Sequence, residues 1–296
     1  MNLSLVTVPF DSAMHNTRMG VGPGHLIRSG LVSYLEANGH DVGVGEVMPP
    51  PESKLAEIRT AFELARGISR EVRVALGSDR LPIILSGNCN SSIGTVAGVR
   101  GEVIAVFWFD SHGDYNTPDT TVGGFLDGMS LATLTGRCWK QLALSVDGFE
   151  AVAECDAVLL GVRDLDPLES DLLSASDVRA LSPAAVRASL PDVLSGISQR
   201  GVRDAYVHLD LDVLDPSEGQ ANSFAVAGGL TVREVQDALL EIGRRFHIRA
   251  AGVTAFDPSY DTDGRVQRAA FELIGTIVEA AAGASAFYGI TGNEGW

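Results

Sequence analysis

The sequence predicts an α/β fold in which a parallel sheet lies between two layers of helices. Short apolar segments alternate with longer amphipathic ones along the chain, and several of the short segments are apolar on both faces, as in VIAVFWF at 103–109. Such strands are typical of a parallel sheet covered by helices on each side. Their alternation with helices predicts a three-layer sandwich. Because no internal repeat or later break divides the chain, we expect residues 1–296 to form a single domain.

The predicted elements follow one another in this alternating order. The short apolar runs predict strands at 3–8, 82–85, 103–109, 157–160, 205–211 and 252–256. The longer amphipathic segments predict helices at 53–74, 183–194, 232–246 and 266–282. In an open α/β sheet, ligands bind beyond the carboxyl ends of the strands, so functional side chains are expected at those ends.

The composition excludes several classes of function. Acidic residues outnumber basic ones 38 to 22, which gives a formal net charge of −16. This charge argues against nucleic acid or an anionic membrane as a partner, because both bind basic patches. No basic stretch precedes Asp11, so a signal peptide is not expected, and no apolar run approaches the roughly 18 residues that a membrane helix needs. Three cysteines without paired spacing indicate a reduced, cytoplasmic protein. The partner that we expect is a small-molecule substrate.

An acidic group follows the apolar segment 103–109. This segment runs into DSHGDYNTP, which places Asp110, His112 and Asp114 at alternate positions at the carboxyl end of the predicted strand. Such residues lie on one side of a strand, and two carboxylates beside an imidazole need a compensating positive charge. A lone aspartate at this position would instead indicate a helix cap or a turn.

A second acidic group repeats the pattern in AYVHLDLDVLDP. Asp210 and Asp212 stand two residues apart, His208 lies on the same face, and Asp215 lies just beyond. Together the two groups offer more ligands than one cation takes from a protein. They favour two divalent ions bridged by carboxylates, and the carboxylate-rich ligand set favours a hard ion. We therefore expect two Mn²⁺ ions per chain.

These motifs resemble those of the arginase, or ureohydrolase, family. DSHGDYNTP resembles the family's Asp-x-His-x-Asp-x-Asn-Thr-Pro segment, HLDLDVLDP its x-x-Asp-x-Asp-x-x-Asp-Pro segment, and GVRDLDPLE and AGGLTVRE also fit. The resemblance implies the arginase α/β sandwich with an eight-stranded parallel sheet, and a homo-oligomer, either a trimer or a hexamer. It implies that the substrate's α-group contacts are Asn116 and Asp166, and that the metal ligands are Asp110, His112, Asp114, Asp210 and Asp212.

Three positions outside the segment that carries Cys89 depart from the family pattern. Asp127 stands where arginases usually carry a proton-shuttling histidine, and a carboxyl group with a raised pKa would do the same work. Gly123 replaces a hydroxyl residue that helps to bind the substrate's α-carboxylate. Ala255 replaces the glutamate that pairs with the guanidinium, and Asp257 is expected to point to the other side of the chain. A buried guanidinium needs a partner, so arginine itself is expected to be a poor substrate.

Cys89 lies in SGNCNSSIG, at a predicted strand–turn–helix corner. The segment resembles the family's Gly-Gly-Asp-His-Ser-x-x-x-Gly, which places Cys89 at a metal-binding histidine. Hydroxyarginine-cleaving arginase-like enzymes also carry a cysteine there, and a thiolate ligates divalent ions, although it is softer than imidazole. Two alternatives remain. Cys89 is a small buried residue, as free cysteine often is, or it is a nucleophile, which needs an imidazole base within hydrogen-bond reach.

The expected function is that of a dinuclear manganese-dependent hydrolase that cleaves a C–N bond of a linear guanidino or hydroxyguanidino compound. The missing glutamate leaves open a formimino, ureido or other linear amidine or amide substrate. The altered positions also leave an alternative of another class, a ureohydrolase fold that has lost catalysis and serves as a binding or oligomer-building subunit.

Overall fold

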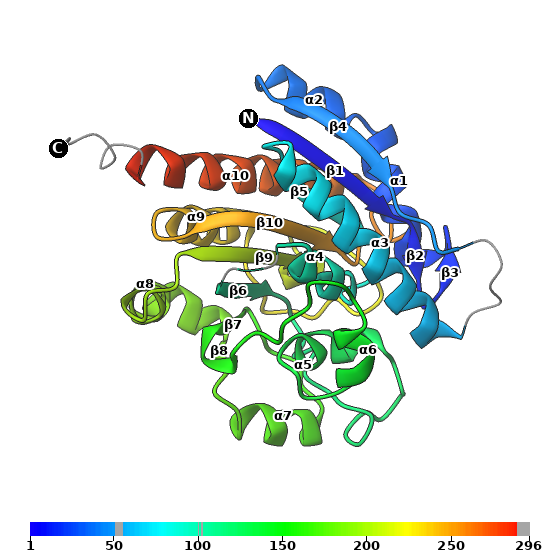
Figure 1. Cartoon of the computed structure of the whole chain (residues 1–296), viewed down its shortest axis with the longest axis vertical. Helices are drawn as coiled ribbons and strands as arrows, with labels where there is room; N and C mark the ends of the chain where they lie inside the picture. Colours follow the sequence, from blue (N-terminus) through cyan, green and yellow to red (C-terminus); the bar gives the residue numbers. More distant parts are fainter. Residues whose placement is uncertain (51–55, 100, 102, 289–296) are drawn as a thin grey trace.

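The computed structural model describes residues 1–50, 56–99, 101 and 103–288. Its centre is an eight-stranded sheet in the order β4-β1-β5-β10-β9-β6-β7-β8, and every neighbouring pair is parallel (Figure 1). This confirms the predicted fold class. A small antiparallel hairpin of β2 and β3 lies outside this sheet. The strands are β1 (Asn2–Val8), β2 (Phe10–Asp11), β3 (Met14–His15), β4 (Asp41–Glu46), β5 (Leu81–Ser86), β6 (Ile104–Phe109), β7 (Ala157–Leu160), β8 (Arg179–Leu181), β9 (Asp204–Asp210) and β10 (His247–Thr254).

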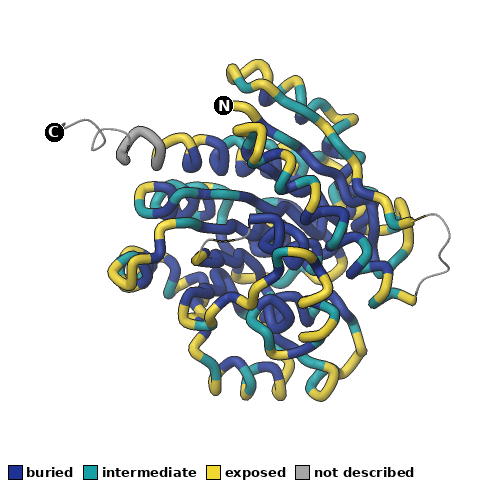
Figure 2. Tube along the Cα trace, in the orientation of Figure 1, coloured by how far each residue is buried: buried dark blue, intermediate teal, exposed yellow. Residues whose placement is uncertain are grey.

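Helices cover both faces of the sheet, because side chains alternate between the two faces of each strand. One apolar cluster packs Leu5 and Phe107 against α1, α2, α8, α9 and α10, and the other packs Val6 and Trp108 against α3, α4 and α5. Figure 2 shows the buried residues concentrated in the sheet and on the inner sides of the helices. The helices are α1 (Gly22–Arg28), α2 (Leu31–Ala37), α3 (Glu57–Gly77), α4 (Ser91–Val99), α5 (Ser130–Leu134), α6 (Lys140–Leu144), α7 (Pro167–Ser174), α8 (Pro183–Gln199), α9 (Val232–Gly243) and α10 (Arg265–Tyr288).

The predicted strands correspond to β1, β5, β6, β7, β9 and β10, although β10 begins at His247 and not at residue 252. β4 and β8, which form the two edges of the sheet, were not predicted from the sequence. β4 reads DVGVGE and is largely exposed, and β8 has three residues. An edge strand needs no continuous apolar run, so neither gave a signal. The predicted helices correspond to α3, α8, α9 and α10, and the predicted start at residue 53 lies outside the described residues.

Helix α4 is buried along its whole length and fixes the corner that precedes it. All nine of its residues are buried, because it lies between α3 and the sheet. A Cβ atom on Gly94 would lie 2.4 Å from the Ala65 carbonyl oxygen, and one on Gly98 would lie 2.4 Å from Val72 Cβ. Both glycines are therefore required for α3 to approach so closely. This packing positions the turn before α4, which carries Cys89.

Two further properties bear on the environment of the protein. Among the described residues, no helix combines the length and the apolar character that crossing a bilayer requires. The cysteines are free thiols, with Cys89 and Cys138 buried and Cys155 exposed.

Candidate metal and substrate site

The carboxyl ends of four neighbouring strands meet at a cavity of about 200 Å³. The turn after β5 carries Cys89, the loop after β6 begins with Asp110, β9 ends at Asp210, and Ala255 follows β10. Asp110 itself lies just behind the cavity wall, where it is buried. The other predicted site residues all line the cavity: Cys89, His112, Asp114, Asn116, Asp127, Asp166, Asp210 and Asp212.

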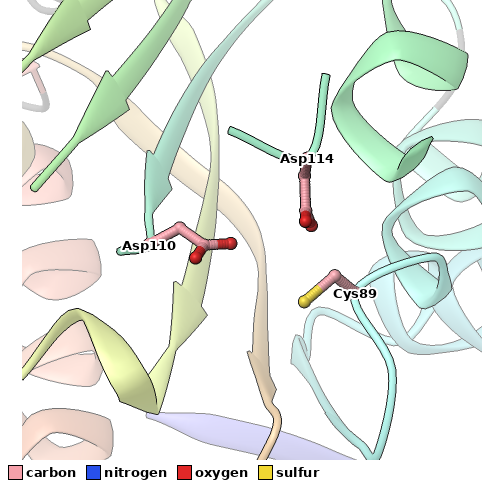
Figure 3. A group of neighbouring side chains, drawn as sticks. All are labelled: Cys89, Asp110 and Asp114. Carbon is pink, nitrogen blue, oxygen red and sulfur yellow. The ribbon is translucent and has the colours of Figure 1, made fainter. Parts of the chain in front are cut away.

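The candidate metal ligands form two groups that share one carboxylate. Cys89, Asp110 and Asp114 each place a ligand atom within 4.8 Å of the other two. In Figure 3 these three side chains point toward a common space. Asp110 also forms a group of the same dimensions with His112 and Asp212. A shared carboxylate between two ligand groups is the arrangement that a bridged pair of ions requires.

Backbone amides hold the two leading aspartates in place. Asp110 Oδ1 accepts a hydrogen bond from the His112 amide at 2.8 Å, and Asp210 Oδ1 accepts one from the Asp212 amide at 2.8 Å. The same short turn therefore follows both strands, which explains why the two sequence motifs look alike. The second oxygen of Asp210 faces the other candidate ligands and accepts the Cys89 thiol proton at 3.1 Å.

Asp114 lies in an unusual position. Its φ of 47° falls in the left-handed region, which residues other than glycine rarely adopt. Its Oδ2 atom is buried and has no hydrogen-bond partner among the described residues. A buried carboxylate oxygen without a partner is costly. A cation between Asp114, Asp110 and Cys89 would remove this cost, so the residues present fit a metal ion.

Burial raises the pKa of the clustered acids. Desolvation, followed by repulsion from neighbouring carboxylates, raises the pKa of both Asp114 and Asp210 well above the usual range. Burial also raises the pKa of Asp110. The same two effects raise the pKa of the Cys89 thiol well above its ordinary value. Without a cation these groups therefore keep their protons to a higher pH than usual, and a divalent ion among them would oppose that shift.

In the absence of a metal ion, the imidazole of His112 carries a positive charge near neutral pH, opposite to that of the carboxylates around it. Burial would lower its pKa, but the hydrogen bond with Asp110 and the charge of Asp212 outweigh burial and raise the pKa to about 9. Its Nδ1 atom lies 3.3 Å from Asp110 Oδ1 and 3.5 Å from Asp212 Oδ2. The proton on this nitrogen thus partly offsets the carboxylates, and a metal ion would take its place.

Asp127 begins a short 3₁₀ helix, η2 (Asp127–Met129), on the cavity wall. Its Oδ2 atom accepts a hydrogen bond from Asn88 Nδ2 and its Oδ1 atom accepts one from the Asn90 amide, each at 2.9 Å. Burial outweighs these bonds and raises the pKa of Asp127 to about 7. A carboxyl group with this pKa gains and loses its proton near neutrality, which is the property expected of a proton shuttle.

The two predicted substrate contacts lie together, with Asn116 Nδ2 donating to Asp166 Oδ2 at 3.2 Å. Glu169, which was not predicted, holds the backbone next to both residues in place. Its carboxylate accepts hydrogen bonds from the Asp166 amide at 3.2 Å and from the Tyr115 amide at 2.8 Å. The Asp-x-x-Glu spacing at the start of α7 is that of a capping box, so a signal for this residue was present in the sequence.

Two phenylalanines that the sequence analysis missed form an aromatic wall of the cavity. The rings of Phe125 and Phe224 stack with their centroids 5.8 Å apart, although they come from different loops. The edge of Phe224 also meets His112, with ring centroids 6.4 Å apart. A single phenylalanine in a loop follows no periodic pattern, so nothing in the sequence marked this pair.

Ala255 lies on the cavity wall with a left-handed φ of 61°. Asp257 turns away from the cavity, as expected, because its Oδ1 atom accepts hydrogen bonds from the Ser259 amide at 3.0 Å and hydroxyl at 2.7 Å. Asn222, another residue that was not predicted, donates to the Ala255 carbonyl oxygen at 2.8 Å and to Asp212 Oδ2 at 3.3 Å. The position expected for a carboxylate that pairs with a guanidinium is therefore occupied by the methyl group of Ala255. The neighbouring side-chain amide of Asn222 already donates its hydrogen bonds within the protein.

The surroundings of Cys89 bear on its three possible roles. Within the described residues, its sulfur has two hydrogen-bond partners, Asp210 Oδ2 at 3.1 Å and Thr254 Oγ1 at 3.3 Å. Neither partner is an imidazole. His208 shares a face of its strand with Asp210, as predicted, but lies outside the cavity lining and reaches the sulfur through the Thr254 hydroxyl. This arrangement lacks the direct base that a nucleophilic cysteine needs.

The cavity as a whole is strongly acidic. Among the described residues, no lysine or arginine lines it. Such a lining attracts cations and repels anions, so it suits metal ions and a substrate with a positively charged end. Its carboxylates are Asp114, Asp127, Asp164, Asp166, Glu169, Asp210 and Asp212.

Comparison with known proteins identifies the family. A family model described as "Arginase family" matches residues 1–279. The chain belongs to the arginase family. Arginase from Bacillus caldovelox is 28% identical to this arginase-family protein over 291 residues, covering 93% of this chain and 97% of that protein. The two aspartate motifs therefore identified the family correctly, and the protein is an arginase-family hydrolase.

Solved structures agree with this assignment. The crystal structure of arginase from Bacillus cereus matches with a TM-score of 0.83 and 26% identity, covering 94% of this chain and 98% of that chain. The agmatine ureohydrolase of Thermoplasma volcanium has a TM-score of 0.72 at 18% identity, covering 97% of this chain and 92% of that chain, and shares the fold. The expected arginase-type sandwich is thus confirmed.

We predict that the protein, kept in a chelator, is less stable at about pH 8.5 than at about pH 6.5. Raised pKa values, to about 7 for Asp127, to about 9 for His112 and well above the usual range for Asp114, mean that the folded chain holds protons that the unfolded chain has released. The free energy of unfolding therefore falls as pH rises through these values. Burial lowers the pKa of His208 to about 3, which acts in the opposite sense, but only below the ordinary value of 6.5.

Thermal unfolding at the two pH values measures this effect. Asp114→Asn should reduce the loss of melting temperature, because it removes one buried acid and weakens repulsion of the others. Asp164→Asn removes an exposed acid from the same cavity, whose charge makes a smaller contribution to the raised pKa of His112, and should reduce the loss less than Asp114→Asn does. A melting temperature that is equal or higher at the upper pH would contradict this account of the cluster.

Proposed function

We propose that this arginase-family protein is a dinuclear manganese-dependent hydrolase that cleaves a C–N bond of a linear hydroxyguanidino or guanidino compound. The proposal rests on the two overlapping ligand groups that share Asp110, one of which contains Asp114, whose buried Oδ2 atom has no hydrogen-bond partner among the described residues. Carboxylate oxygens make up most of the donor set, which favours a hard divalent ion such as Mn²⁺.

The two ions would be held by side chains from three strand ends. Cys89 and Asp114 would bind one ion, His112 and Asp212 would bind the other, and Asp110 would serve both, with Asp210 beside them. When bound, such a pair of ions lowers the pKa of a shared water and supplies hydroxide near neutral pH. The remaining requirements of the reaction, proton transfer and substrate orientation, fall to the protein's own groups.

Asp127 is suited to move the proton. Hydrolysis of the C–N bond releases an amine, whose nitrogen must gain a proton as the bond breaks. The pKa of Asp127, raised by burial to about 7, allows its carboxyl to deliver that proton and to be recharged at neutral pH. Hydrogen bonds from Asn88 and from the Asn90 amide keep its oxygens on the cavity wall.

The Asn116–Asp166 pair is suited to hold the far end of the substrate. An exposed carboxylate joined to an amide provides a hydrogen-bond site for a substrate ammonium group. Gly123 offers no hydroxyl at this wall, but Thr121 lines the same part of the cavity and carries one. The acidic lining adds a general attraction for a cationic end.

The other end of the cavity favours a head group that is less basic than a guanidinium. Ala255 presents a methyl group, the Asn222 amide is already bonded to Asp212 and the Ala255 carbonyl, and Phe224 adds an aromatic surface. A buried guanidinium pays a desolvation penalty, and residue 255 offers no carboxylate to pair with it. A hydroxyguanidine is less basic and is penalised less. A formimino or ureido head group meets the same condition and is the second candidate.

The completeness of the ligand set supports an enzyme over a subunit that has lost catalysis. Four aspartates that are at most 7% exposed lie together with Cys89 and His112, and burial together with mutual repulsion raises the pKa of Asp110, Asp114 and Asp210. A binding subunit would have no use for such a costly cluster. Loss of metal binding would relax the need for these acids, yet every predicted ligand position still carries a donor.

We predict that Asp114→Asn and Asp210→Asn each lower the manganese content of protein expressed with Mn²⁺, because each removes a negative charge that the ions require. Elemental analysis after gel filtration should give about two ions per wild-type chain and at most about one in each variant. Asp164→Asn, an exposed acid in the same cavity, should keep the full content. A full metal load in either ligand variant would contradict the dinuclear assignment.

We predict that N-hydroxyarginine is cleaved with a kcat/KM at least about tenfold above that of arginine, a difference of about 1.4 kcal/mol in barrier. The assay is release of hydroxyurea or urea, with formimino and ureido compounds in the same screen. Ala255→Glu should lower the ratio of kcat/KM for N-hydroxyarginine to kcat/KM for arginine, because it supplies a carboxylate for the guanidinium. Ala255→Gln, which has the same size but no charge, should leave this ratio unchanged. Arginine as the best substrate of the wild type would overturn the argument from Ala255.

We predict that Cys89→His keeps both ions, because imidazole is a normal ligand for such metals. Cys89→Ala should weaken one ion by at least about tenfold, with activity partly restored by excess Mn²⁺. Metal titrations of both variants separate the three roles of Cys89. A packing residue would leave Cys89→Ala close to wild type. A nucleophile would leave both variants inactive at every metal concentration.

A further inference from the structure

A row of buried polar side chains leads away from the candidate metal site into the core. The Cys89 sulfur lies 3.3 Å from Thr254 Oγ1, which lies 3.3 Å from His208 Nε2, and His208 Nδ1 lies 2.9 Å from the Tyr206 hydroxyl. None of these four residues is more than 3% exposed. Polar groups at this depth are costly unless they are hydrogen-bonded to one another, and here each is.

The same row also touches the other side of the site. The His208 ring stacks on Trp108, with centroids 3.6 Å apart and an interplanar angle of 14°. The Trp108 indole N–H donates to Asp110 Oδ2 at 3.1 Å. His208 therefore connects, through one residue on each side, to the sulfur of Cys89 and to the carboxylate shared by both ligand groups.

The surrounding sheet is shaped to admit this row. A Cβ atom on Gly252 would lie 2.5 Å from the Tyr206 hydroxyl and 3.5 Å from His208 Nδ1. Glycine in β10 thus leaves the space in which the phenol and the imidazole meet. Neither residue lines the cavity, so neither has a place in substrate binding or in proton transfer to the substrate.

The donors and acceptors along the row have a consistent direction. A neutral imidazole donates from one nitrogen and accepts at the other. If the Tyr206 hydroxyl donates to Nδ1, then Nε2–H donates to Thr254 Oγ1. The Thr254 hydroxyl is then free to donate to the Cys89 sulfur. A sulfur that binds a metal ion has lost its own proton and accepts such a hydrogen bond.

We propose that Thr254, held by His208 and Tyr206, is a positioning residue that aims the Cys89 sulfur at the metal ion. This inference rests on the proposed function, because it gives the sulfur a metal to bind. The hydroxyl fixes the direction of the sulfur lone pairs in the way that a carboxylate behind a metal-binding histidine fixes its ring. The Trp108–His208 stack ties the orientation of Asp110 to the same scaffold.

The test uses full-length protein loaded with Co²⁺, because a thiolate bound to Co²⁺ gives a charge-transfer absorption in the near ultraviolet. Thr254→Val replaces the hydroxyl with a methyl group and keeps the branched shape of the side chain. Thr254→Ser keeps the hydroxyl. The chain offers a matched control in Thr133, whose hydroxyl lies 3.3 Å from the buried sulfur of Cys138, outside the site. Tyr206→Phe removes one oxygen from the far end of the row and serves if Thr254→Val does not fold.

We expect the wild type to show the thiolate band and Cys89→Ser to lack it. Thr254→Val should shift or weaken the band and lower the affinity for Co²⁺ by about tenfold. Thr254→Ser should restore both, Tyr206→Phe should change both in the same direction by less, and Thr133→Val should change neither. Loss of packing alone would lower the melting temperature without moving the band.

Three other results overturn the inference in distinguishable ways. A wild-type band and affinity in both Thr254→Val and Tyr206→Phe would show that the row does not position the sulfur, and would leave the proposed function intact. Wild-type protein that binds Co²⁺ without a thiolate band would remove Cys89 from the metal and refute the row with it. Wild-type protein that binds no Co²⁺ would refute the proposed function as well.

Discussion

Charge compensation is the constraint on which this structure depends. Four aspartates with almost no solvent exposure lie together at the carboxyl ends of the central strands β6 and β9. They cannot all be ionised together without positive charge among them. The fold creates this situation by making β6 and β9 neighbours and by ending both strands with the same amide-bonded turn. His112 supplies a proton as partial compensation, and the orphaned oxygen of Asp114 indicates where a metal ion would complete it.

The positions that depart from the arginase pattern all face this one cavity. Cys89 offers a softer donor than imidazole, Asp127 offers a carboxyl whose pKa burial raises to about 7, and Ala255 removes a carboxylate from the head-group wall. Under the proposed function, Ala255 would disfavour a permanently charged guanidinium, and Asp127 would change how a proton reaches the leaving amine. They are therefore better explained as adaptation to a different head group than as decay of a site, because decay would not spare the remaining ligands.

Local periodicity carried enough information to predict the core of the fold and the place where the candidate ligands lie together. Alternation along β6 and β9 predicted which residues share a face, and the strand ends predicted where they meet. Depth within a face is different. His208 lies on the same face of its strand as Asp210, as the alternation predicted, yet it does not line the cavity. Its depth depends on the twist of the sheet and on ring stacking against Trp108, and such tertiary contacts leave no local sequence pattern. Contacts between separate loops, such as Phe125 with Phe224, have no local pattern and were missed. The edge strands β4 and β8 were missed because neither is buried on both faces.

The proposed function requires two metal ions that would share the Asp110 carboxylate, and electron paramagnetic resonance of the Mn²⁺-loaded protein is the sharpest test of that requirement. Two ions about 3.5–4 Å apart and bridged by a carboxylate are exchange-coupled. The wild-type protein should give the broad, many-line spectrum of a coupled pair of ions. In Asp110→Asn this spectrum should collapse to the spectrum of isolated ions. A wild-type spectrum of isolated Mn²⁺ at full metal load would contradict the shared carboxylate and the dinuclear site built on it.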